Sequence, residues 1–105
     1  MHGSHDIGLA GEKAAAEQLE EKNWRITRWD TTSPGATDIE AQSGAKKVLV
    51  QVKSAVVPNE PASLSVAEER NIKSRATGIG AEAWEARVQL DELLSLVAIK
   101  WRKLN

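Results

Sequence analysis

The sequence is most informative between residues 35 and 54, which read Gly35-Ala36-Thr37-Asp38-Ile39-Glu40-Ala41-Gln42-Ser43-Gly44-Ala45-Lys46-Lys47-Val48-Leu49-Val50-Gln51-Val52-Lys53-Ser54. In the short segment 37–42 polar and apolar side chains alternate from residue 38 onward, and residues 46–54 are rich in valine, which are both patterns of β-strands. The short segment 43–45 contains a glycine, as hairpin turns commonly do. We therefore predict two antiparallel strands joined by a tight turn.

This predicted hairpin has two chemically different faces, because side chains alternate across a strand. Val48, Val50 and Val52 share one face of the second strand. The natural register buries these valines together with Ile39 and Ala41 of the first strand. The opposite face then collects four polar side chains, namely Asp38, Glu40, Gln51 and Lys53.

The rest of the chain supplies helices and further strands around the hairpin. Residues 6–22 have helical periodicity with Asp6 able to cap their start, and residues 24–29 alternate as a strand does. Ser65-Val66-Ala67-Glu68 is a capping box that predicts a helix to about residue 77, where Gly78 can supply a left-handed cap. Residues 84–90 and 94–101 are the remaining strands. The predicted order is α-β-β-β-α-β-β, a central mixed α/β sheet flanked by helices.

Composition limits the size and class of the protein. The chain has 105 residues, so we expect one domain over 1–105, with residues 1–5 resembling the remnant of an expression tag. It has no cysteine, which excludes disulfides and thiolate zinc sites. Neither a membrane span nor a signal peptide is evident, which predicts a cytoplasmic protein. The net charge of −1 means that any contact with nucleic acid depends on a local basic patch.

The polar face of the hairpin has the parts that phosphodiester hydrolysis requires. A divalent cation such as Mg²⁺ or Mn²⁺ neutralises developing charge and activates water, and it prefers oxygen ligands. Asp38, the Gln51 side-chain oxygen and the Val52 carbonyl are candidate ligands, and Lys53 can hold the attacking water. Taken alone, Asp38 and Lys53 also suit a cross-strand ion pair, and Glu40 suits a solvated neighbour.

These residues resemble the core motif of the PD-(D/E)XK (restriction-endonuclease-like) nuclease superfamily. The match consists of residues 35–41 followed by residues 48–54. Gly11-Glu12, on a helix that ends at Asn23-Trp24, is similar to the first helix of small members such as archaeal Holliday junction resolvases. Two positions depart from the usual pattern: Thr37 stands for the proline, and Gln51 stands for the second acidic residue.

The resemblance implies a metal-dependent DNA endonuclease, selective for DNA structure as junction resolvases are. It assigns Asp38, Gln51, Lys53 and Glu12 to the active site, and Glu12 to the metal ligands as well. Arg70, Lys73 and Arg75 of the second helix are candidate DNA contacts, although a solvated helix face has the same composition.

Partners and alternative functions follow from the same features. Cleavage of two opposed strands needs two sites, so we expect a homodimer that buries tryptophans and the apolar side of strand 84–90. Two alternatives remain open. One is a nuclease-like module that binds DNA or protein without cleavage, which Gln51 and the near-neutral charge favour. The other is a structural dimer whose tryptophans form the interface.

Overall fold

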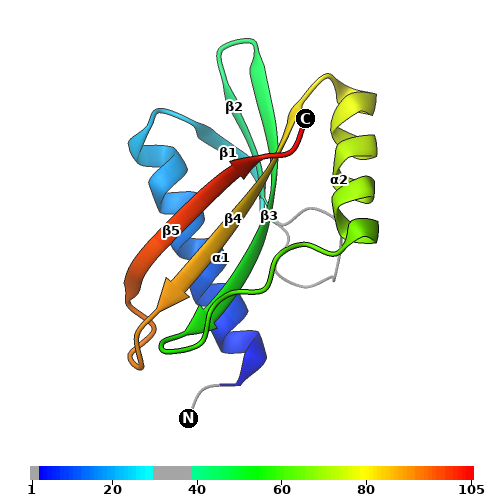
Figure 1. Cartoon of the computed structure of the whole chain (residues 1–105). Helices are drawn as coiled ribbons and strands as arrows, with labels where there is room; N and C mark the ends of the chain where they lie inside the picture. Colours follow the sequence, from blue (N-terminus) through cyan, green and yellow to red (C-terminus); the bar gives the residue numbers. More distant parts are fainter. Residues whose placement is uncertain (1–2, 30–38) are drawn as a thin grey trace.

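The structure, a computed structural model, describes residues 3–29 and 39–105. Within these residues the elements follow the order α1 (Ser4–Glu21), β1 (Arg25–Trp29), β2 (Ile39–Ser43), β3 (Lys46–Val56), α2 (Val66–Ile79), β4 (Glu82–Leu90) and β5 (Leu96–Lys103). The two helices lie on opposite sides of one sheet (Figure 1). The element order predicted from the sequence is confirmed. None of the described helices is long and apolar enough to cross a membrane.

The strands form a single mixed sheet in the spatial order β1-β2-β3-β4-β5. Neighbouring strands are antiparallel except for β3 and β4, which are parallel. A parallel pair needs a long crossover connection, and here the segment 57–81 with helix α2 provides it. Strand β3 therefore lies in the middle of the sheet, with one helix layer on each of its faces.

Helix α1 covers the valine face of β3. Residues 8–21 are mostly alanine, leucine, glutamate, lysine and glutamine, all strong helix formers, and small alanines allow the helix to approach the sheet closely. The cluster buried between helix and sheet consists of Ala15, Ala16, Leu19, Ile39, Ala41, Val48, Val50 and Ala86. Ile39 pairs with Val50 and Ala41 pairs with Val48, so the register predicted for the hairpin is confirmed.

The apolar side of β4 belongs to the interior of the chain. Ala86, Val88 and Leu90 are completely buried. The expectation that strand 84–90 offers apolar surface to a second copy is therefore wrong for these residues, because the chain's own core already covers them. The exposed apolar side chains of this region lie instead on β5, at Leu96 and Val97.

Helix α2 covers the opposite face of the sheet. Its completely buried residues, Ile72 and Ala76, pack against Leu49 of β3 and Ala83 of β4. The helix ends at Ile79, two residues later than predicted, because Gly80 supplies the left-handed cap with a φ of 70°. The prediction placed this cap at Gly78, which lies inside the last turn of the helix.

Helix α1 also differs from the prediction at its start. It begins at Ser4, so two of the residues assigned to a tag remnant are helical. The N-cap is Gly3, which makes no side-chain hydrogen bond, and Asp6 lies in the first turn. A carboxylate at that position interacts favourably with the helix dipole without acting as a cap.

The loop between β3 and α2 is fixed to the polar face of β4. Three alternate side chains of β4 bind its backbone: Gln89 Nε2 donates to Asn59 O at 3.1 Å, Arg87 Nη2 donates to Pro61 O at 2.6 Å, and Glu85 Oε2 accepts from Leu64 N at 2.9 Å. These contacts hold the segment that leads directly into the capping box of α2. They therefore determine where the first turn of α2 lies over β3.

Gly11 offers a test of the contact between α1 and β3. A Cβ at this position would come within 2.8 Å of Ser54 Cβ, so Gly11→Ala requires a backbone shift and is expected to lower the free energy of unfolding by about 1–3 kcal/mol. Gly8→Ala in the same helix is the matched control, because a Cβ there meets no atom within 4 Å. Alanine's helix propensity predicts that the control gains up to about 1 kcal/mol. Urea unfolding followed by tryptophan fluorescence measures both, and equal effects at the two positions would contradict the packing described.

Glu85 offers a pH-dependent test of the loop anchor. Its side chain is 1% exposed, and burial opposes ionisation, yet hydrogen bonds from Arg102 and from the Leu64 N–H lower the pKa of Glu85 below its ordinary value of 4.5. A lowered folded-state pKa gives stability that is present above pH 4.5 and is lost as pH falls through the folded value. Glu85→Gln should therefore cost about 1–3 kcal/mol at neutral pH, and this difference should shrink below pH 4.5.

The control for Glu85→Gln is Glu60→Gln, at an exposed position in the anchored loop. It is expected to change stability by less than about 0.5 kcal/mol at any pH. Unfolding free energies measured from neutral pH down to acid conditions separate the two variants. A cost for Glu85→Gln that does not vary with pH would refute the role given to its ionised form.

Candidate active site on the polar face of β3

Glu68, in the first turn of α2, is the residue on which the polar side chains of β3 converge. Lys53 Nζ lies 2.7 Å from Glu68 Oε2, and Gln51 Nε2 donates to the same oxygen at 3.4 Å. The other carboxylate oxygen, Oε1, accepts a hydrogen bond from the Ser65 N–H at 3.0 Å. The capping box predicted from the sequence thus fixes this carboxylate while it faces β3.

The ionised state of Glu68 is favoured by its neighbours. The hydrogen bond from Lys53 is the main cause that lowers the pKa of Glu68, and the Ser65 backbone N–H adds to it. Glu68 is therefore a carboxylate at neutral pH, and Lys53 is held as its cationic partner. Both side chains keep about a third of their surface exposed, so a substrate can approach the pair from solvent.

Gln51 is the buried member of this group, with 6% of its surface exposed. Its amide nitrogen is directed to Glu68, which leaves the oxygen, Oε1, directed elsewhere. That oxygen is buried and has no hydrogen-bond partner among residues 3–29 and 39–105. A buried carbonyl oxygen without a partner is energetically costly, and it is also the kind of ligand that a hard divalent cation accepts.

The other residues predicted for the site do not join Gln51, Lys53 and Glu68 in the contacts that the structure describes. Asp38 lies outside the described residues. Val52, between Gln51 and Lys53, points its side chain toward the α1 layer and keeps its carbonyl on the strand. Glu12 lies on α1 and accepts a hydrogen bond from Trp29 Nε1 at 3.0 Å. The structure therefore brings together Gln51 and Lys53, whereas the described contact of Glu12 is with β1.

Helix α1 nevertheless contacts the same part of β3 next to Glu12. The preceding residue, Gly11, packs directly on Ser54 and Val52, immediately beyond Gln51 along the strand. In the part of the chain that the structure describes, no group of three or more histidine, cysteine or acidic residues could hold a metal ion. The ligand set expected from the sequence, which includes Asp38 outside the described residues, therefore stays a prediction.

The basic residues predicted to contact DNA do not form one uniform patch. Lys73 pairs with Glu69 at 3.6 Å, and Glu69 also pairs with Arg102 of β5 at 3.0 Å. Arg70 and Lys73 line one shallow groove on α2, whereas Arg75 is exposed and does not line it. Arg102 continues the network inward to the buried Glu85, at 3.0 Å. Part of the positive charge of α2 is therefore neutralised within the chain.

Two residues of this face were not singled out from the sequence, although signals for both exist. Glu68 was recognised only as a helix cap, and its contact with Lys53 depends on the path of a loop. Glu85 lies opposite Gln51 in the parallel register of β3 and β4. Strand alternation therefore places Glu85 on the polar face, but the partners that keep it ionised come from a loop and from β5.

Comparisons with known proteins bear on the fold. No protein-family model matches the chain, and no curated protein matches it. Among solved structures it is similar to Hjc of Archaeoglobus fulgidus, described as a Holliday junction resolvase from an archaeal hyperthermophile. The two share 23% sequence identity with a TM-score of 0.65, over 92% of this chain and 72% of Hjc. The predicted fold class is confirmed: the chain is an α/β protein whose mixed five-stranded sheet resembles that of Hjc.

Proposed function

We propose that this chain is a DNA endonuclease that hydrolyses phosphodiester bonds with the help of Mg²⁺ or Mn²⁺ and selects branched DNA. The observation that carries the proposal is the arrangement on β3. The buried Gln51 oxygen, which has no hydrogen-bond partner among the described residues, lies two positions from Lys53, and both side chains contact Glu68. The similarity to Hjc, a junction resolvase, supports this choice of substrate.

The residues that would hold the ion are Asp38, the Gln51 side-chain oxygen and the Val52 carbonyl. The family resemblance adds Glu12, although α1 covers the opposite face of the sheet. A bound divalent ion would supply an activated water and would neutralise charge on the phosphate. Lys53 would hold that water or a phosphate oxygen through its ammonium group. Glu68 would fix the ammonium and would orient the Gln51 amide so that its oxygen, rather than its nitrogen, faces the ion.

The number of charged ligands would set the affinity of this site for a divalent ion. Gln51 brings no charge, so Asp38 would be the dedicated anionic ligand on the hairpin. Affinity for divalent ions depends on the number of charged ligands. We therefore infer that the free protein binds Mg²⁺ weakly and that DNA phosphate completes the ligand set.

Substitutions at the three motif residues test the proposal through cleavage. Asp38→Ala should abolish the nicking of plasmid DNA, because it removes the charged ligand. Lys53→Ala should leave metal binding unchanged and lower the rate by about 10²–10⁴-fold, the scale for a positioned electrostatic or acid–base group. Gln51→Glu should tighten metal binding and maintain or raise the rate, because it adds a charged ligand.

The same assay includes two further variants. Glu68→Gln should lower the rate less than Lys53→Ala does, since the ammonium stays present but loses its charged partner. Lys13→Ala is the control, because Lys13 lies on the exposed side of α1 and pairs only weakly with Glu17 at 4.0 Å. Rates are measured across Mg²⁺ and Mn²⁺ titrations on plasmid, junction, flap and duplex DNA. If neither the wild type nor Gln51→Glu cleaves any of these, the endonuclease proposal is refuted.

A second candidate function is a binding module that retains the fold without cleavage. One observation favours it: Lys53 is already satisfied by Glu68, as it would be in a purely structural ion pair. A gel shift that weakens with salt, without cleavage by any variant, is the result expected of a DNA-binding module.

We also propose that the chain acts as a homodimer, because resolving a junction requires cuts in two strands and each chain carries one candidate site. The exposed apolar residues Leu96 and Val97 of edge strand β5 are a candidate surface for such contact. Light scattering at high micromolar concentration should give twice the monomer mass, and Val97→Lys should reduce it toward the monomer. A wild-type monomer at that concentration would exclude the dimer.

A further inference from the structure

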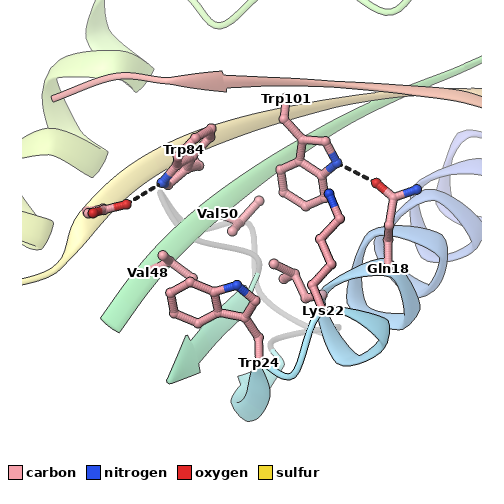
Figure 2. A pocket seen from close by; sticks show the side chains of 9 residues that line it. Gln18, Lys22, Trp24, Val48, Val50, Trp84 and Trp101 are labelled. Carbon is pink, nitrogen blue, oxygen red and sulfur yellow. Dashed lines mark hydrogen bonds between the residues drawn. The ribbon is translucent and has the colours of Figure 1, made fainter. Parts of the chain in front are cut away.

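The face of the sheet opposite the candidate active site has a hollow lined by tryptophans. Its volume is about 370 Å³, within the range of small-molecule sites. It is lined by residues from α1, β3, β4, β5 and the α1–β1 connection: Gln18, Leu19, Lys22, Trp24, Val48, Val50, Glu82, Trp84 and Trp101. Figure 2 shows the three indoles placed around Val48 and Val50.

The floor and the walls of this hollow differ in burial. Val48 and Val50 are 3% and 0% exposed, so the floor belongs to the core. Trp24, Trp84 and Trp101 are only partly buried and form the walls. The sequence contains four tryptophans, and three of them meet here from three separate segments. Indole surface left open to solvent in a concave site is the usual setting for a flat apolar ligand.

The hydrogen bonds already made by the polar groups of the hollow indicate what kind of ligand would fit it. Trp101 Nε1 donates to Gln18 Oε1 at 2.5 Å, and Trp84 Nε1 donates to Glu82 Oε1 at 2.9 Å. Both acceptors are therefore already in use. Trp24 Nε1 and Lys22 Nζ have no partner within residues 3–29 and 39–105, and both are donors. These two donors favour an occupant that brings acceptors.

The charges around the hollow agree with this conclusion. Among the described residues that line it, Glu82 is the only acidic one, and Oε2 of this carboxylate pairs with Lys103 at 3.7 Å. The hydrogen bond from Trp84 and the cations Lys103 and Lys46 lower the pKa of Glu82, so its negative charge is already balanced. Lys22, whose side chain extends toward Trp101 in Figure 2, makes no ion pair with the carboxylates of residues 3–29 and 39–105. The net local field favours an anion.

We infer that this hollow is a second binding site, separate from the candidate active site, for a flat aromatic ring that carries an anionic group. A nucleobase with its phosphate has this chemistry. The ring would stack against the indoles over the two valines, and the phosphate would bind Lys22 and the Trp24 N–H. The inference does not depend on cleavage, because the hollow lies under α1 whereas Gln51, Lys53 and Glu68 lie on the α2 side of the sheet.

The test is a calorimetric titration with three probes in the absence of divalent metal. Deoxyadenosine monophosphate should bind with a dissociation constant of about 0.1–1 mM, the range expected for a stacked base plus one charge contact. Deoxyadenosine, which lacks the anion, and inorganic phosphate, which lacks the ring, should each bind at least about tenfold more weakly. A titration with a single strand of deoxyadenosine nucleotides then separates two sources of this chemistry. Tighter binding of the strand than of the mononucleotide indicates an unpaired base in a strand, and weaker binding indicates a free nucleotide.

Variants assign the binding to the hollow. Trp101→Ala should weaken binding of the nucleotide by about tenfold, the scale of one lost stacking contact. Lys22→Gln should weaken binding of the nucleotide but leave binding of deoxyadenosine unchanged. Because Lys22 lies on the surface, the substitution should leave folding intact. Trp29→Ala and Lys13→Gln are the matched controls, since neither residue lines the hollow. Both should bind as the wild type does.

Three results would overturn the inference. The first is absence of nucleotide binding by the folded wild type, and the second is binding of phosphate alone as tight as that of the nucleotide. The third is a Trp101→Ala variant that binds the nucleotide as the wild type does but changes the oligomeric state in light scattering, since the indoles would then face a second copy. Cleavage activity is measured separately, so failure here leaves the proposed endonuclease function unaffected.

Discussion

Strand β3 has to satisfy two different environments at once, because it lies in the middle of the sheet with a helix on each face. On one face Val48 and Val50 are buried against α1. On the other face Leu49 is buried under α2, and the next two outward positions, Gln51 and Lys53, meet the first turn of that helix. Side chains on this face thus change from apolar to polar along the strand. Gln51 and Lys53 lie at the margin of the core, where Glu68 positions them and Lys53 stays accessible to solvent.

The crossover from β3 to α2 determines what those groups meet. Glu85, Arg87 and Gln89 of β4 bind the backbone of the loop, so the capping box that follows has a defined position. The capping interaction then serves two purposes, because Glu68 satisfies the helix terminus with one oxygen and holds Gln51 and Lys53 with the other. A helix cap and a candidate active site thus share one carboxylate.

Local patterns in the sequence were sufficient to predict the order of elements, the hairpin register and the two faces of β3. They were sufficient because strand parity and capping boxes depend on neighbours within a few positions. The contact of Lys53 with Glu68 joins residues fifteen positions apart through an irregular loop, and no periodicity encodes it. The cap at Gly80 was misplaced because Gly78 has the same propensity, and the tryptophan-lined hollow was missed because its walls come from separate segments.

We propose that the polar face of β3 holds a divalent ion through Gln51. Diffraction at the manganese absorption edge, from crystals of the protein grown with Mn²⁺ and a DNA junction, tests it directly. The expected result is an anomalous peak within ligand distance of Gln51 Oε1, with Asp38 on the same side of the sheet and Lys53 beside the phosphate. A peak elsewhere, with Gln51 Oε1 bonded to protein and Asp38 on the opposite side of the sheet, would show that Gln51 is not a metal ligand.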